Sequence, residues 1–347
     1  MNRRDLESEM RVAWHDPAVD PGRCVHTHAE VASCERCVAT CPTSAWVLDD
    51  EQLAIDPAAC DGCGLCAAAC PEGALAHDAE PELRRWGGWT TAFAACERAG
   101  HDVRGASVLC VHAIGLARLA ALYRGGVRRL LVCVGECADC PRGAAQRLSD
   151  RLAVLNRVLA ECGLPGIVAS RLTAAQWRSV FSEASPHAQG PALSRRGFLR
   201  SALAVAAESG LLGQPWEWRA PGESLPRADA RGMVFYAPQL DPLRCNGCDA
   251  CVRVCPHAVL RLADDSEAYD ISADACTGCG LCADVCDQGA ISVEACCRVK
   301  DARVSLRAGR CRACGADFHR PRSAGAGPTR CHVCAQTGHH QKLFQVI

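Results

Sequence analysis

The sequence predicts a multidomain chain of mixed α+β and α/β class, in which two small cysteine-rich modules flank a small parallel α/β domain. A chain of 347 residues exceeds the length at which a single core usually stops growing. Most of its 28 cysteines fall in short repeated spacings, whereas residues 90–185 alternate apolar strand-like runs with helical periods. We therefore expect domains at residues 20–80, 90–185, 232–297 and 305–347, with a helix and linker at 186–231.

Composition restricts the compartment and the partners. A cysteine-rich chain is either a secreted disulfide protein or a metal protein, and the spacing here favours metal. Residues 1–20 are polar and charged, and no apolar run reaches the roughly 18 residues that span a bilayer. We therefore expect a cytoplasmic protein with no membrane span. The net charge of -1 predicts no nucleic-acid partner.

The second cysteine-rich module has the clearest motif. A C-x2-C-x2-C-x3-C-P pattern is formed by Cys245, Cys248, Cys251, Cys255 and Pro256, and its spacing returns at Cys276, Cys279, Cys282 and Cys286. This run resembles the bacterial two-cluster ferredoxins, in which the fourth cysteine of each motif ligates the other cluster. The resemblance implies one 4Fe-4S cluster on Cys245, Cys248, Cys251 and Cys286, and another on Cys255, Cys276, Cys279 and Cys282. Asp287 stands where the pattern has proline, which puts the local potential in question but not the ligation.

The first module repeats this plan with one departure. Its motifs are Cys34, Cys37 and Cys41 before Pro42, and Cys60, Cys63, Cys66 and Cys70 before Pro71. Val31 occupies the position of the expected first cysteine, so Cys24 must supply that ligand, although His26 or His28 could replace it. The implied clusters are then Cys24, Cys34, Cys37 and Cys70, and Cys41, Cys60, Cys63 and Cys66. Structural zinc is the alternative for both modules, but zinc sites use two cysteine pairs and not repeated triplets.

The middle region predicts a small parallel sheet. Its pattern gives strands at 107–111, 129–134 and 166–170 and helices at 116–123, 144–161 and 174–181, the last capped by Thr173. Parallel strands present their carboxyl ends at one edge, where we expect Cys110 after the first strand and Cys133, Cys137 and Cys140 after the second. Cys96 could reach the same edge, whereas Cys162 closes a helix at the opposite edge and is expected to be an inert thiol.

The same region resembles the iron-sulfur delta subunit of methyl-viologen-reducing nickel-iron hydrogenases. The resemblance is carried by Cys96 with the following Ala99-Gly100-x-Asp102, by Cys110, and by Leu130-Leu131-Val132 leading to Cys137-Ala138-Asp139-Cys140. It implies a 2Fe-2S cluster on Cys96, Cys110, Cys137 and Cys140, with Cys133 in reserve. It also implies a redox partner such as a flavin-containing dehydrogenase or hydrogenase. Unmetallated cysteines and a zinc site are the alternatives.

A twin-arginine-like segment follows the middle region. Residues 194–200 read SRRGFLR and precede an apolar run to Leu212, as in export signals. Because such signals are read at an N-terminus, we interpret this one as a gene-fusion relic or a basic amphipathic helix that does not direct export. The proline-rich residues 213–231 predict a linker.

A zinc ribbon is predicted at the C-terminal end. Two C-x2-C pairs, Cys311 with Cys314 and Cys331 with Cys334, can deliver four thiolates tetrahedrally to one zinc ion. Mononuclear iron of the rubredoxin type uses the same geometry and is the alternative. We expect solvated side chains at His319, His332, His339 and His340, and packed thiols at Cys296 and Cys297.

These motifs together predict an iron-sulfur electron-transfer protein, or polyferredoxin, that relays single electrons between a partner dehydrogenase or hydrogenase and an acceptor oxidoreductase. The expected cofactors are four 4Fe-4S clusters, a 2Fe-2S cluster and one zinc ion. The sequence contains no nucleotide-binding glycine motif, nucleophile elbow or flavin fingerprint, so we expect an electron-transfer subunit without catalysis of its own. Two alternatives stay open: a thiol or disulfide oxidoreductase acting at the middle cysteines, and a redox-sensing regulator.

Overall fold

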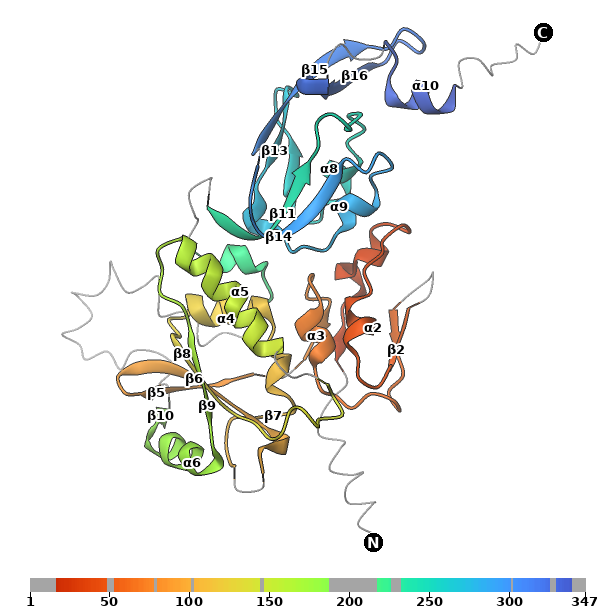
Figure 1. Cartoon of the computed structure of the whole chain (residues 1–347). Helices are drawn as coiled ribbons and strands as arrows, with labels where there is room; N and C mark the ends of the chain where they lie inside the picture. The colour runs from red at the N-terminus through yellow and green to blue at the C-terminus, as the bar shows by residue number, and fades with distance from the viewer. Residues whose placement is uncertain are drawn as a thin grey trace, which may run out of the picture. The chain divides into compact units, whose positions relative to one another are not determined.

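The computed structural model describes residues 17–48, 53–77, 80–100, 103–143, 147–186, 217–225, 232–300, 302–324 and 329–338. They divide into two compact units, of which the first contains residues 1–24 and 35–226 and the second contains residues 25–34 and 227–347. Figure 1 follows the chain through the elements of both units. The twin-arginine-like segment and the residues His339 and His340 lie outside the described residues.

The first cysteine-rich module consists of short paired elements. They are β1 (Ala18–Val19), α2 (Arg36–Thr40), β2 (Trp46–Leu48), β3 (Leu53–Ile55), α3 (Leu65–Ala69) and β4 (Leu75–Ala76). Strands β1 and β4 pair antiparallel, as do β2 and β3. Each helix ends directly before the last cysteine of its motif, because the proline after that cysteine disfavours continuation of the helix.

The middle region contains one mixed sheet with helices on both faces. Its strands are β5 (Glu82–Trp86), β6 (Trp89–Cys96), β7 (Ser107–Val108), β8 (Arg129–Cys133), β9 (Val168–Leu172) and β10 (Ser185–Pro186). The strand order is β10-β5-β6-β8-β9, with β7 also paired to β6. Strands β6, β7, β8 and β9 are parallel, whereas β5 and β10 join antiparallel. The parallel part of the sheet therefore brings the carboxyl ends of β6 and β8 to one edge.

The helices of the middle region occur close to where the sequence predicts them. They are α4 (Leu116–Arg124), α5 (Arg147–Glu161) and α6 (Ala174–Glu183). Thr173 caps α6 through a reciprocal capping box with Gln176, as its position predicts. The predicted strand at 107–111 is shorter, because the chain turns into the 3-10 helix η4 (Val111–Ala113) directly after Cys110.

The central strand of this sheet is absent from the sequence prediction. Strand β6 reads WTTAFAAC, and its alanines have higher helix than strand propensity. Tertiary packing decides in favour of a strand, because Phe93 and Ala95 face Trp177 of α6 while Ala92 and Ala94 are buried on the other face. Helices α4 and α5 lie together on the side of the sheet opposite α6 (Figure 1). The strand is thus buried on both faces, as central parallel strands are.

The second unit joins the second cysteine-rich module to the C-terminal hairpin. Its elements are β11 (Met233–Leu240), α8 (Ala250–Val254), β12 (Leu260–Leu262), β13 (Ala268–Ile271), α9 (Leu281–Asp284), β14 (Ile291–Arg298), β15 (Arg303–Arg310), β16 (Asp317–Pro321) and α10 (His332–Thr337). Strand β11 pairs with β14, and the order β12-β13-β15-β16 forms one antiparallel sheet. The β15-β16 hairpin, whose connection carries Cys311 and Cys314, therefore extends the sheet of the cysteine-rich module.

Short 3-10 helices connect these elements. They are η1 (Pro21–Arg23), η2 (Val25–Thr27), η3 (Glu97–Ala99), η4, η5 (Pro221–Ser224), η6 (Ala273–Ala275) and η7 (Arg322–Ala324). The described part of the predicted linker includes η5, which packs against α4 with Pro221 and Ser224 buried. Among the described residues, no helix has the length and apolarity needed to cross a bilayer.

Candidate metal centres

The second module gathers its cysteines into the two groups that the ferredoxin resemblance implies. Burial raises the pKa of Cys251 to about 12, together with the charges of Cys245, Cys248 and Cys286. Burial likewise raises the pKa of Cys282, and Cys276 and Cys279 lie close enough to add to the shift. One recess is lined by Cys255, Cys276, Cys279 and Cys282. Several buried thiolates that repel one another are stable only beside a cation, so this donor set fits a metal cluster.

The last cysteine of each motif occupies the same kind of turn. The backbone N–H four residues later donates to its sulfur, at 3.3 Å for Cys41, 3.3 Å for Cys70, 3.4 Å for Cys255 and 3.3 Å for Cys286. Cys286 keeps this bond although Asp287 replaces the proline of the other motifs. Hydrogen bonds to sulfur stabilise a thiolate, so all four turns are suited to cluster ligands.

The first module brings part of its predicted groups together in the same way. Burial raises the pKa of Cys66 to about 11, and the charges of Cys60 and Cys41 add to it. Burial also raises the pKa of Cys70, with a contribution from the charge of Cys24. Cys37 and Cys66 pack with Trp46 and Leu75 in a buried apolar cluster. Low solvent access of this kind favours cluster stability and tunes its potential.

The alternatives to Cys24 as a ligand in the first module are His26 and His28. The Nε2 of His26 lies 2.8 Å from the carbonyl oxygen of Cys34. A carbonyl oxygen only accepts, so Nε2 carries the proton and has no lone pair for a metal. His28 is exposed. The proximity of Cys24 to Cys70 therefore favours Cys24 as the ligand.

The middle region has a recess at the carboxyl edge of its parallel strands, which we call the four-cysteine recess. Its lining is Cys96, Cys110, Cys137 and Cys140 with Val111, His112, Val134 and Arg142. The cysteines come from three segments: the end of β6, the residue before η4, and the loop after β8. Burial raises the pKa of Cys110 to about 11, and the charges of Cys96 and Cys140 add to it. All four cysteines of the predicted ligand set are thus neighbours.

The two remaining cysteines of this region lie elsewhere. Cys133 is buried on the face of β8 that packs against Phe93 and Trp177, and it is absent from the lining of the recess. Because side chains alternate along a strand, Cys133 shares its face with Leu131. Cys162 follows α5, after Glu161. Cys133, the reserve ligand of the sequence analysis, therefore belongs to the apolar core.

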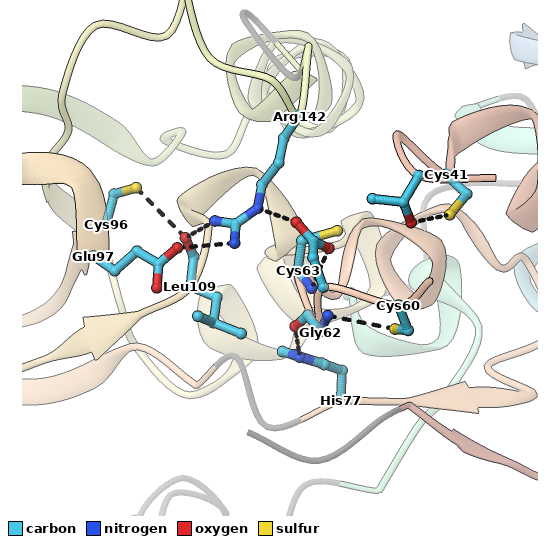
Figure 2. Close-up of polar contacts among 11 residues, drawn as sticks. Cys41, Cys60, Gly62, Cys63, His77, Cys96, Glu97, Leu109 and Arg142 are labelled. Carbon is cyan, nitrogen blue, oxygen red and sulfur yellow. Dashed lines mark hydrogen bonds and ion pairs between the residues drawn. The ribbon is translucent and has the colours of Figure 1, made fainter. Parts of the chain in front are cut away.

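Arg142 joins the four-cysteine recess to the first module. Its side chain is 7% exposed, and its Nε donates to Asp61 Oδ2 at 2.7 Å while its Nη2 lies 2.8 Å from Glu97 Oε1. Its Nη1 also donates to the carbonyl oxygen of Leu109 at 2.7 Å. Figure 2 shows Arg142 between Glu97 and Leu109 on one side and the Cys63 loop on the other. The residues beside Cys96, Cys110 and Cys60 are thereby tied to one guanidinium group.

The first module's loop at Cys60 and Cys63 is held by further polar contacts. Burial alone would raise the pKa of Asp61, but the hydrogen bond from Arg142 and that from Cys63 outweigh burial and lower it. The backbone N–H of Gly62 donates to Cys60 Sγ at 3.4 Å, and His77 Nε2 donates to the carbonyl oxygen of Gly62 (Figure 2). These contacts hold the loop that carries Cys60 and Cys63.

Arg142 and His112 are site residues that the sequence analysis missed. Arg142 is one of many arginines and gives no motif signal, although its position two residues after Cys140 could have marked it. His112 likewise follows Cys110 by two residues, and its Nε2 lies 3.7 Å from Cys137 Sγ. A search for polar residues next to candidate ligands would have found both.

The four C-terminal cysteines form a compact group. The sulfurs of Cys311, Cys314, Cys331 and Cys334 all lie within 4.8 Å of one another. Backbone N–H groups that point at its sulfur lower the pKa of Cys311, which favours its thiolate. Gly315 supplies the positive φ of 76° that its turn needs. Four clustered sulfurs of this kind match a tetrahedral metal site.

The structure contradicts the prediction of a solvated side chain at His319. His319 is not solvated, because its Nε2 lies 2.8 Å from Asp249 Oδ1 and its side chain is 16% exposed. Gly247, in the loop that carries Cys245 and Cys248, packs so closely on β16 that a Cβ would overlap the carbonyl oxygen of His319. The C-terminal hairpin therefore supports the ligand loop of the second module.

Comparison with known families agrees with the two cysteine-rich modules. Residues 32–74 and 244–290 each match the family model described as a 4Fe-4S dicluster domain. The chain thus carries two 4Fe-4S dicluster domains of the ferredoxin type. These domains support the interpretation that it is an iron-sulfur electron-transfer protein. The matched segments contain the cysteine motifs that the sequence analysis singled out, except that Cys24 precedes the first segment.

Proposed function

We propose that this protein is an electron-relay subunit with five iron-sulfur clusters and one structural zinc ion. Four 4Fe-4S clusters are held by the sixteen motif cysteines in the paired sets implied by the ferredoxin resemblance, including Cys24. A 2Fe-2S cluster is held by Cys96, Cys110, Cys137 and Cys140, and zinc by the C-terminal four cysteines. The electrons pass between a flavin-containing dehydrogenase or hydrogenase and an acceptor oxidoreductase.

The observation that carries this proposal is the contact between two candidate cluster sites within the first unit. Cys63 of the first module and Cys110 of the four-cysteine recess pack with Leu65 in one buried cluster. Electron transfer weakens steeply with distance, so a relay needs carriers that lie close to one another. The buried apolar contact and the Arg142 bridge both support a direct path between these sites.

The chain's own residues prepare these sites in three ways. When bound, the clusters supply one-electron carriers, which the protein side chains lack. Buried residues such as Leu65 and Trp46 keep solvent away from the sulfurs. The backbone N–H donors to Cys41 and Cys255 stabilise negative charge on the sulfurs, and Arg142 fixes the two ligand loops relative to each other.

The decisive experiment is a metal and sulfide count on protein purified without oxygen, for the wild type and two matched variants. We expect about 18 iron and one zinc per chain in the wild type. Cys110→Ser should lose about two iron, whereas the control Cys133→Ser should keep them, because Cys133 lies outside the recess. About 16 iron with two zinc in the wild type would show that the recess holds zinc. Equal iron loss in the two variants would contradict the assigned ligand set.

The partner proposal has a separate test. We expect the reduced protein to bind and exchange electrons with a flavin-containing dehydrogenase or hydrogenase encoded beside it, as measured by stopped-flow absorbance of the clusters. Absence of binding and transfer with every such partner would remove this part of the proposal. The cluster assignment would stand, because it depends on the metal count.

The same stopped-flow measurement separates the relay from a thiol or disulfide oxidoreductase. A relay passes electrons to protein acceptors and leaves low-molecular-weight disulfides unreduced. Turnover of a disulfide that is abolished by Cys137→Ser but not by Cys162→Ser would instead favour an active site at the recess.

A further inference from the structure

The four-cysteine recess contains one imidazole besides its sulfurs, that of His112. His112 lies in η4, two residues after Cys110, and is 9% exposed. His112 lines the recess, and its Nε2 lies 3.7 Å from Cys137 Sγ. A buried imidazole beside candidate metal ligands is either a further ligand or a hydrogen-bond donor. The two roles need opposite tautomers, because only a nitrogen without a proton can bind metal.

The structure distinguishes these roles through the other ring nitrogen. The backbone N–H of Leu148 donates to His112 Nδ1 at 3.2 Å. Leu148 lies in the first turn of α5, where backbone N–H groups have no partner within the helix. Nδ1 is therefore an acceptor without a proton, and the proton of the neutral ring is on Nε2.

The backbone of His112 is also held in place. Arg151, which lies one turn further along α5, donates from Nη1 to the carbonyl oxygen of His112 at 2.6 Å. Both the main chain and the ring of His112 are thus fixed by α5. This helix aims the Nε2–H group at Cys137 and keeps it from rotating away.

We propose that His112 is a positioning residue that donates an Nε2–H···S hydrogen bond to Cys137 and raises the reduction potential of the 2Fe-2S cluster. This inference rests on the proposed cluster in the recess. A hydrogen bond to a ligand sulfur stabilises the extra negative charge of the reduced cluster, so its loss lowers the potential. The cluster keeps four cysteine ligands, and histidine does not replace any of them.

Three substitutions separate the donor from the structural contact with α5. His112→Asn keeps an acceptor at the Nδ1 position for Leu148 but cannot reach Cys137. His112→Gln places an amide N–H at the reach of Nε2. His112→Leu removes both contacts. If the donor controls the potential, His112→Gln should keep the wild-type potential, whereas His112→Asn and His112→Leu should both lower it.

The test is a redox titration followed by electron paramagnetic resonance, with iron counted in every sample. In His112→Asn and His112→Leu we expect the oxidised-to-reduced ratio of one centre to rise about tenfold at a fixed potential, which equals a potential about 59 mV lower for one electron. The other centres should be unchanged. Protein labelled with ¹⁵N-histidine should show a weak nitrogen coupling that His112→Asn abolishes.

Three results would overturn the inference. A strong coupling from directly bound nitrogen would make His112 a ligand. About 18 iron in all samples with an unchanged potential in His112→Asn and His112→Leu would refute the tuning role alone. About 16 iron in the wild type would refute the proposed 2Fe-2S cluster and the tuning role with it, so the iron count tells the two failures apart.

Discussion

Arg142 Nε and Asp61 Oδ2 are 2.7 Å apart, and this ion pair joins a loop of the first dicluster domain to the loop after Cys140. The guanidinium is nearly inaccessible, whereas Asp61 and Glu97 are 30% and 37% exposed. Removing the cation leaves both carboxylates without their main partner, so Arg142 has a larger role than surface arginines. The relation is testable through the free energy of unfolding.

Arg142→Met should lower the free energy of unfolding of the first unit by about 1–3 kcal/mol. This range lies below that of fully buried pairs because solvent screens the two carboxylates. Arg157→Met is the matched control, since Arg157 is exposed on α5 and methionine is compatible with a helix. Anaerobic urea unfolding followed by circular dichroism measures both variants. Similar midpoints for the two would refute the role of Arg142.

Cys24→Ser should remove up to about four iron per chain, because one corner of a 4Fe-4S cluster loses its ligand. His26→Ala and His28→Ala should keep the iron content of the wild type. The expected spectroscopic sign in Cys24→Ser is a three-iron signal or the loss of one cluster. Retention of all iron in Cys24→Ser together with loss in His26→Ala would assign the ligand to histidine.

Cys311→Ser should release about one zinc per chain and leave the iron content unchanged, since the C-terminal group is separate from the cluster motifs. Cys162→Ser is the control and should keep every metal. If the wild type contains about 19 iron and no zinc, and Cys311→Ser loses one iron, the site is of the rubredoxin type.

Tyr269 should remain protonated in the folded protein at a pH at which ordinary tyrosines ionise. Burial raises its pKa far above the usual value, and the hydrogen bond that its hydroxyl donates to Asp249 adds to the shift. The folded state therefore holds this proton more tightly than the unfolded state, which ionises near pH 10. The resulting stabilisation is fully present below about pH 10 and declines as the pH rises through the folded pKa.

Phenolate absorbance measures this prediction, because the chain has only three tyrosines. The difference between the wild type and Tyr269→Phe should show no phenolate at pH 11 in folded protein, and one phenolate after denaturation. A full phenolate signal from Tyr269 in the folded state at that pH would contradict the buried Tyr269–Asp249 bond.

The cysteine motifs made much of the candidate chemistry predictable. A ligand set that is local in sequence, such as Cys276, Cys279 and Cys282, is constrained by the length of its own loop, so spacing alone indicates a cluster. The helix α6 was equally predictable from its capping residue Thr173 and its period. Strand β6 was not, since its alanines favour a helix until Trp177 and the neighbouring strands bury them.

The sequence by itself determined which cysteines are candidate metal ligands, by residue type and spacing, and where the helices beside them lie, because both depend on short-range geometry. Only the tertiary structure decided that Cys133 belongs to the core, that Arg142 joins Asp61 to Glu97, and that Leu148 orients His112. These relations involve residues far apart in the chain. They depend on strand order and on the face to which each side chain points, which local spacing does not specify.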